Sequence, residues 1–159
     1  MSDQLTITER LTERGERPEG GLEYTATVDR PFGCVGRPCD WLPRVERQLR
    51  AIAALAPGWD SHGAPSPDGR VVDAAERLIG CVSEAGALPE PYVNPTPGGG
   101  VQFEWESGPR YFEVEVLAER AAQYFYRDDA LRIEEQGEVF EGESLGDVVA
   151  YVSRVASAS

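Results

Sequence analysis

The amino-acid sequence predicts one α+β domain over residues 41–159: two helices, an antiparallel meander of four or five strands, and a C-terminal helix. In the first part of this range, apolar residues recur every three or four positions, as in amphipathic helices. Over 101–116 they alternate strictly with polar residues, as in half-buried strands. Helices followed by a meander are typical of α+β proteins. Residues 1–40 are expected to form an N-terminal arm with a peripheral β-hairpin, because 22–29 also alternate.

The first helix is expected at about 41–55, with Asp40 as its cap. Its buried stripe consists of Trp41, Val45, Leu49 and Ile52. The second helix is expected to begin after a cap at Ser66, with Pro67 at its first position. Its stripe consists of Val71, Ala75, Leu78 and Val82. The last helix, 145–156, is expected from a capping box formed by Ser144 and Asp147.

The register of the meander can be derived from its turns. A two-residue loop at Gly108-Pro109 pairs Trp105 with Phe112 and places every apolar residue of both strands on one face. The same register places Glu104 opposite Glu113. If 119–120 form the next loop, Tyr124 and Tyr126 join the polar face. For the fourth strand, a two-residue loop would turn Leu131 and Ile133 to solvent, and a three-residue loop would turn them to the core.

This polar face is the candidate partner-binding site. Its predicted members are Glu104, Glu106, Glu113, Glu115, Tyr111, Tyr124 and Tyr126. Like charges directly opposite each other destabilise a sheet slightly. The face is interpreted either as a solvated surface that favours solubility or as a docking surface for a basic protein, with tyrosines as rigid anchors. A catalytic carboxylate pair or a divalent-cation site is a further alternative.

The charge composition narrows the partner class. The chain has 159 residues, 28 acidic and 15 basic, for a net charge of −13. Every basic residue is an arginine, which excludes lysine nucleophiles and Schiff bases. A protein that binds nucleic acid needs a positively charged surface, so this acidic chain is not expected to bind nucleic acid. No apolar run reaches membrane-spanning length and no secretory signal is recognised, so no membrane association and a cytoplasmic location are expected.

The string Gly58-Trp59-Asp60-Ser61-His62-Gly63-Ala64-Pro65 is the most distinctive in the sequence. Trp59, like Trp105, is predicted to be buried in the core. Asp60 suits side-chain bonds to a turn backbone, and Gly63 permits a positive φ. Adjacent Asp60, Ser61 and His62 cannot converge as a catalytic triad does. The string is therefore interpreted as a structural loop, with a binding loop as the alternative.

The odd number of cysteines indicates free thiols in a reducing compartment. Cys34 and Cys39 could join His62 and Cys81 as zinc ligands, but the spacing is loose and Cys81 lies beside an apolar stripe. No metal and no cofactor are expected. A Cys34–Cys39 disulfide under oxidising conditions remains an alternative.

Two motifs resemble those of a family of small uncharacterised bacterial and phage-associated proteins. GWDSHGAPSP is similar to that family's GWD-x-x-GA-x-P, and PTPGGGVQFEW to its P-x-P-x-GG-x-Q-x-EW; the similarity covers about 49–117. The resemblance implies shared positions at Trp59, Asp60, Gly63, Gly99, Gln102 and Trp105. It implies no activity.

Size and charge favour a non-enzymatic acidic protein-binding module of the antitoxin, immunity or regulatory-inhibitor kind, with a basic protein as its partner. One alternative is a small hydrolase or metal-dependent enzyme that uses the meander carboxylates. Another is a nucleic-acid mimic that occupies a basic cleft. An open acidic face would favour the binding module, and carboxylates gathered in a cleft would favour the enzyme.

Overall fold

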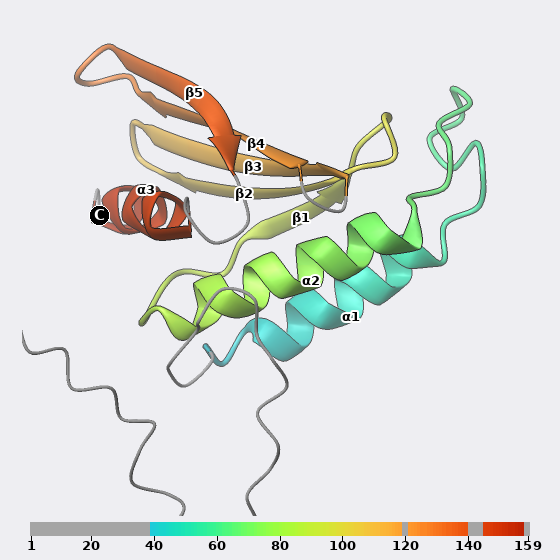
Figure 1. Cartoon of the computed structure of the whole chain (residues 1–159). Coiled ribbons are helices and arrows are strands. Elements are labelled where there is room, and N and C mark those ends of the chain that lie inside the picture. The colour runs from blue at the N-terminus through green and yellow to red at the C-terminus, as the bar shows by residue number, and fades with distance from the viewer. Residues whose placement is uncertain (1–38, 119–120, 140–144, 158–159) are drawn as a thin grey trace, which may run out of the picture.

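The computed structural model of the chain describes residues 39–118, 121–139 and 145–157. Two helices come first, α1 (Leu42–Ala53) and α2 (Gly69–Glu84), and α3 (Leu145–Ala156) comes last. Between them the chain forms a five-stranded sheet (Figure 1). The predicted α+β fold and the order of its elements are thus confirmed. The predicted N-terminal hairpin and the cap at Ser144 lie outside the described residues.

The sheet is an antiparallel meander in which sequence neighbours are also spatial neighbours. Its strands run in the order β1-β2-β3-β4-β5. Their bounds are Tyr92–Pro95, Val101–Ser107, Arg110–Ala118, Ala121–Asp128 and Ile133–Val139. Because every connection joins adjacent strands, β1 and β5 form the two edges of the sheet.

The helices cover one face of this sheet, and no other described segment lies on the opposite face. Figure 1 shows α2 and α3 against the same side of the sheet, with α1 packed along α2. The core between these layers contains the predicted helical stripes and the inward residues of β2 and β3, including Phe103, Trp105, Phe112 and Val114. The opposite side of the sheet, here called the open face, therefore carries the outward side chains of all five strands.

Both N-terminal helices begin later than expected. Asp68, not Ser66, caps α2: its carboxylate accepts the Arg70 backbone N–H at 2.8 Å. At α1 the N-cap residue is Trp41, not Asp40; its backbone is already helical and its side chain makes no cap bond. The bounds of α3 agree with the prediction.

The connector between α2 and β1 is held by two tryptophans. Trp41, at the start of α1, donates its indole N–H to the Leu88 carbonyl at 2.7 Å. Trp105, in β2, donates to the next carbonyl, that of Pro89, at 3.0 Å. Both side chains are buried, and their polar atoms are satisfied as buried indoles require. Residues 88–89 are thus bound to the helical layer and the sheet at once.

A buried ion pair joins the sheet to the C-terminal helix. Asp128, only 1% exposed at the end of β4, accepts the Arg110 Nε at 2.8 Å and the Leu131 backbone N–H at 3.1 Å. Arg110 also donates to the Arg154 carbonyl of α3 at 2.7 Å. Burial acts to raise the Asp128 pKa, but the Arg110 bond and the backbone N–H outweigh it and hold the pKa below its usual value.

The predicted pairing of β2 with β3 is confirmed, and that of β3 with β4 is wrong by one residue. Glu104 faces Glu113 and Trp105 faces Phe112, as expected from the two-residue turn. Between β3 and β4 the register shifts at Leu117, where a β-bulge interrupts the ladder. An extra residue in one strand reverses the faces of the paired strand. Glu113 therefore faces Phe125, not Tyr126.

The β4–β5 connection is longer than either predicted loop. Asp128 pairs with Ile133, so the loop contains residues 129–132. Ile133 packs against the core, whereas Leu131 lies in the loop and is 63% exposed. Each predicted loop length assigned both residues to the same side, and the four-residue loop separates them.

Candidate functional site

The open face is strongly acidic. The strand registers place glutamates from β2, β3 and β5 on it: Glu104, Glu106, Glu113, Glu115, Glu134 and Glu138. Among the described strands, Arg127 of β4 contributes the cationic side chain of this face, opposite Glu134. The four glutamates predicted for the site thus lie together, and β5 adds two more. An uneven charge balance of this kind attracts a basic partner and repels an acidic one.

The central carboxylates are held by neutral donors. Glu104 accepts from the Asn94 side-chain amide of β1 at 3.0 Å. Glu113 accepts from the Gln102 amide at 2.6 Å and from the Tyr111 hydroxyl. Because amides and hydroxyls carry no formal charge, these bonds position the carboxylates without neutralising them. Their charge remains on the surface.

Aromatic side chains lie among the carboxylates. The Tyr111 and Phe125 rings are 6.3 Å apart, and the Arg127 guanidinium lies 5.6 Å from the centre of the Tyr111 ring. Partial burial, together with the neighbouring Glu113 carboxylate, raises the Tyr111 pKa well above its ordinary value. Tyr111 is therefore a neutral hydrogen-bond donor at physiological pH. Tyr92, at the β1 edge, is 70% exposed on the same face.

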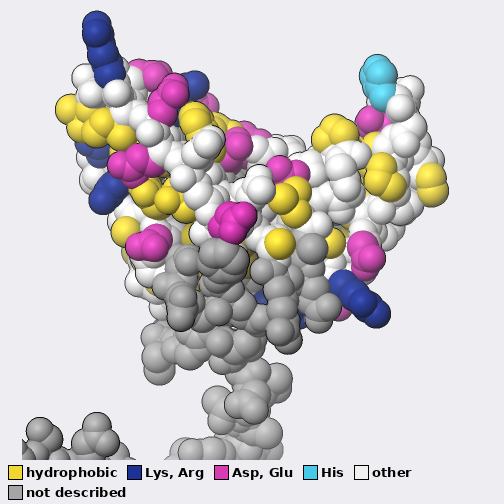
Figure 2. All heavy atoms as spheres, turned by 45° about the horizontal axis from the view of Figure 1, so that its top comes forward, with side chains coloured by type: hydrophobic (Ala, Val, Ile, Leu, Met, Phe, Trp, Pro, Cys, Tyr) yellow, Lys and Arg dark blue, Asp and Glu magenta, His cyan; other side chains and the backbone are white. Residues whose placement is uncertain are grey.

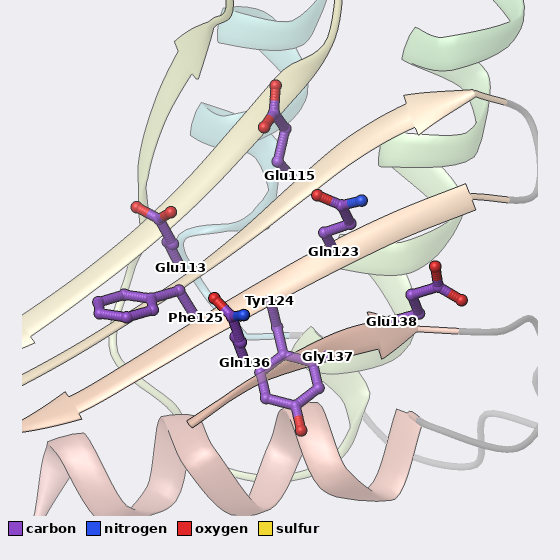
Figure 3. Close-up of a pocket in the computed structure, with 8 residues that line it drawn as sticks. All are labelled: Glu113, Glu115, Gln123, Tyr124, Phe125, Gln136, Gly137 and Glu138. Atoms are coloured by element: carbon purple, nitrogen blue, oxygen red, sulfur yellow. The ribbon is translucent and has the colours of Figure 1, made fainter. Parts of the chain in front are cut away.

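A depression of about 440 Å³ lies on the β3–β5 side of the open face. Its lining includes three glutamates, two glutamines and Phe125: Glu113, Glu115, Glu138, Gln123, Gln136, with Tyr124 and Gly137 completing it. Figure 3 shows Glu113, Glu115 and Gln136 extending from one side of the sheet. Figure 2, which looks onto the top of the Figure 1 view, shows the surface hollowed between two raised ends, with carboxylates in magenta across it. This shape suits a convex or extended partner.

The expectation that Tyr124 and Tyr126 lie on the acidic face is wrong. The bulge at Leu117 turns both toward α3, where each ring lies close to Tyr151, at 5.2 and 5.0 Å. Figure 3 shows Tyr124 pointing from the strand toward α3, away from Glu113. Phe125 and Arg127 take their places on the open face, and the sequence interpretation missed both. The sequence does contain a signal of the bulge that causes this shift: the consecutive apolar pair Val116-Leu117 breaks the alternation of apolar and polar residues.

The helix side of β5 continues this aromatic cluster. A Cβ on Gly137 would lie 2.7 Å from the Tyr124 ring, so glycine there lets the ring lie across the strand. Tyr151 donates its hydroxyl to Glu135, and the Arg154 guanidinium lies 5.1 Å from the Tyr151 ring centre. Burial and the Glu135 bond raise the pKa of Tyr151. Tyr124, Tyr126 and Tyr151 therefore pack between the sheet and α3.

The GWDSHGA loop is organised by its aspartate. The Asp60 carboxylate accepts the backbone N–H groups of His62 and Ala64, at 2.8 and 3.0 Å, which lowers the Asp60 pKa. Gly63 has φ +90°, a conformation that side chains disfavour. The His62 ring contacts the Asp60 backbone carbonyl, not a serine hydroxyl. This arrangement fits the predicted structural loop and forms no catalytic triad.

Trp59 does not lie in the core as predicted. It is half-buried and donates its indole N–H to the Pro65 carbonyl at 3.1 Å, which closes the loop on itself. Trp41, which was predicted in the buried stripe of the first helix, is 5% exposed, as expected. Trp105, by contrast, is 2% exposed, as predicted.

The two motif segments meet in space. A depression of about 450 Å³ lies between them. One side is formed by the end of the first motif and the first turn of α2, and the other by the β1–β2 turn and the bulge residue of β3. The lining residues are Pro65, Ser66, Asp68, Arg70, Val71, Gly98, Gly99 and Leu117. Gly100, next to it, approaches the backbone so closely that a Cβ would lie 2.8 Å from the Val116 carbonyl. The glycines of the second motif therefore allow the β1–β2 turn to fit against β3.

The cysteines differ from the expectation of free thiols. Cys81 is disulfide-bonded. The odd number of cysteines did not exclude one pair, so the inference drawn from it was wrong for this residue. Cys39 has a free thiol that contacts the Ser83 and Gly86 carbonyls, at 3.1 and 2.9 Å. Cys34 lies outside the described residues.

The described ranges contain neither a cluster of metal ligands nor a membrane-spanning helix. Within 39–118, 121–139 and 145–157, no three acidic, cysteine or histidine side chains are grouped so that they could hold a metal ion. No helix of these ranges has both the length and the apolar character needed to cross a membrane. Comparisons with protein-family models, curated proteins and solved structures found no match to the chain.

Proposed function

We propose that this chain is a non-enzymatic, acidic protein-binding module of the antitoxin, immunity or regulatory-inhibitor kind, and that its partner is a basic protein. The observation that carries the proposal is the open face, where glutamates of three strands surround Tyr111 and Phe125 with Arg127 as the cation. Carboxylates can receive the guanidinium groups of a partner in paired hydrogen bonds. Aromatic rings add contact area at low entropic cost.

The hydrolase or metal-dependent alternative finds less support. The glutamates of the meander that were predicted as a site lie on an open sheet face rather than in an enclosed cleft, and no group of described carboxylates could hold a metal ion. Catalysis by paired carboxylates depends on sharply different environments for the acid and the base. The nucleic-acid mimic would occupy a basic cleft through the same charges, so the identity of the partner distinguishes it from the proposed function.

The test uses the full chain, immobilised and exposed to a cell lysate at two ionic strengths. Glu104→Gln/Glu113→Gln removes two charges from the open face. Asp73→Asn/Glu46→Gln removes two charges from α2 and α1 and serves as the matched control. We expect a basic protein that the wild type and the control retain at low salt and that the open-face variant loses. Equal retention by all three proteins would contradict the proposal.

A further inference from the structure

The two edges of the sheet differ in how they are protected. β1 has four residues, ends at Pro95, follows Pro91, and contacts α1. Short, proline-flanked and covered edges resist the addition of another strand. β5 has seven residues and no proline, and among the described residues it pairs with β4 alone. The edge at β5 is therefore the one at which an extended segment can add to the sheet.

The outward side chains of β5 specify the charge of such a segment. Glu134, Gln136 and Glu138 are exposed and lie on the open face. A strand added beside β5 would place every second side chain next to them, at the roughly 4.8 Å spacing of paired strands. Opposite charges on neighbouring strands stabilise the pair, and like charges destabilise it. The edge thus favours a strand with cationic residues at alternate positions.

The same charges disfavour two other occupants. Pairing β5 with β5 of a second copy would bring glutamates of both chains together on one face. The alternating segment 22–29 of this chain carries Glu23 and Asp29 at its polar positions, which would also add negative charge. Neither occupant would place positive charge beside the glutamates of β5.

The depression beside β5 provides a place for a long cationic side chain. It lies over β3, β4 and β5, with Phe125 between Glu113 of β3 and Gln136 of β5, and with Glu138 also in its lining. An arginine from a strand next to β5 would extend across β5 toward it. Its guanidinium can stack on an aromatic face and bond to carboxylates at its rim.

We propose that β5 is a docking edge that accepts an extended segment of the basic partner, with arginines at alternate positions. Backbone hydrogen bonds to β5 would align the segment, and the arginines would reach the open face. The intervening residues would face the side of Tyr124 and Tyr151, where apolar side chains suit them. The charge of the segment rests on the proposed function, whereas the strand geometry rests on the topology alone.

The test uses the full chain and a peptide as long as β5, seven residues, in which arginine and valine alternate. In two further peptides, alternate backbone nitrogens are methylated, on one edge of the strand or on the other. A methylated nitrogen cannot donate, so methyl groups on the edge facing β5 prevent pairing. We expect the dissociation constant to rise about tenfold or more for one methylation pattern and to stay within about twofold for the other.

Charge is tested in the same titration. A peptide with glutamate in place of arginine should not bind. Glu138→Arg should weaken the arginine peptide about tenfold, while Glu46→Arg on α1 should leave its affinity unchanged. Circular dichroism and thermal unfolding of each variant check that it has folded. Hydrogen exchange should slow at β5 amides when the arginine peptide is present.

The outcomes separate this inference from the proposed function. If both methylation patterns weaken binding equally while salt and Glu113→Gln still reduce it, edge docking is wrong and the acidic face remains the binding surface. If the outward β5 amides are already protected in the free chain, a second copy or the chain's own N-terminal segment covers the edge, which also overturns the inference. The inference would also be overturned if a saturating concentration of the arginine peptide left the hydrogen-exchange rates of the β5 amides unchanged.

Discussion

Glu104 and Glu113 lie directly opposite each other on β2 and β3, and each accepts a hydrogen bond from a different neutral amide. Asn94 supports the first and Gln102 the second. The sheet therefore positions two like charges side by side, and none of the described arginines lies between them. This arrangement costs stability in the isolated protein, and the cost can be measured.

Glu104→Gln should stabilise the protein by about 0.3 kcal/mol at low ionic strength, because it removes one of two opposed charges and keeps an oxygen for Asn94. The gain should shrink as salt screens the repulsion. Glu134→Gln is the matched control: Glu134 faces Arg127, so its neutralisation should destabilise instead. Urea unfolding at two salt concentrations gives both values. Changes of the same sign would contradict the assigned register.

Asp128→Asn should destabilise the protein at neutral pH and much less in acid. The Asp128 pKa is lowered in the folded state, so its contribution is present above the unfolded pKa of about 3.9 and is lost as the pH falls through the lower folded value. Denaturant unfolding of wild type and variant at neutral pH and near pH 3 tests this. A difference in stability that does not shrink on acidification would show that the ion pair with Arg110 is not its source.

Deletion of Leu117 should be tolerated, at a cost of less than about 2 kcal/mol. Leu117 is the extra residue of the bulge, so without it Ala118 still pairs with Ala121 and Val116 with Ala122, and Phe125 and Arg127 stay on the open face. Deletion of Gln123 instead shifts the rest of β4 by one residue, turns Phe125 toward the helices, and should cost more than about 4 kcal/mol. Near-ultraviolet circular dichroism and urea unfolding compare the two variants. Equal losses of stability would contradict the assignment of Leu117 as the bulged residue.

Trp105→Ala should cost about 3–5 kcal/mol, as expected for a fully buried aromatic side chain. Trp59→Ala should cost about 1 kcal/mol, because this half-buried side chain contributes chiefly one hydrogen bond to its own loop. Equilibrium unfolding in urea compares them. Equal losses would indicate that Trp59 supports the core after all.

The parts of the fold that could be predicted are those in which local signals agree. The Gly108-Pro109 turn and the alternation on both sides of it fix the β2–β3 register, and with it the positions of Glu104 and Glu113. The β3–β4 register could not be derived the same way. Tyr124, Phe125 and Tyr126 are all aromatic, so both faces of β4 appear apolar in the sequence and the bulge alone decides between them.

Trp59 shows a second limit. Helical periodicity correctly assigned Trp41 to the buried stripe of the first helix. Trp59 lies in a loop, where periodicity does not apply, and its size alone suggested that it was buried in the core. Instead it donates its indole N–H to the Pro65 carbonyl of its own loop and stays half-buried. Such a bond is not visible in periodicity, so the sequence could not distinguish a core tryptophan from one that closes its own loop.

The two indole bonds to Leu88 and Pro89 also bear on how the protein unfolds. If α1 separates from the connector, the Leu88 carbonyl loses its partner, and if β2 separates, the Pro89 carbonyl does. Separation of either the helices or the sheet from residues 88–89 therefore disturbs a segment that is hydrogen-bonded to both layers. Helices and sheet should therefore exchange their amide protons as one cooperative unit, and a stable intermediate that keeps only one of the two layers should not accumulate.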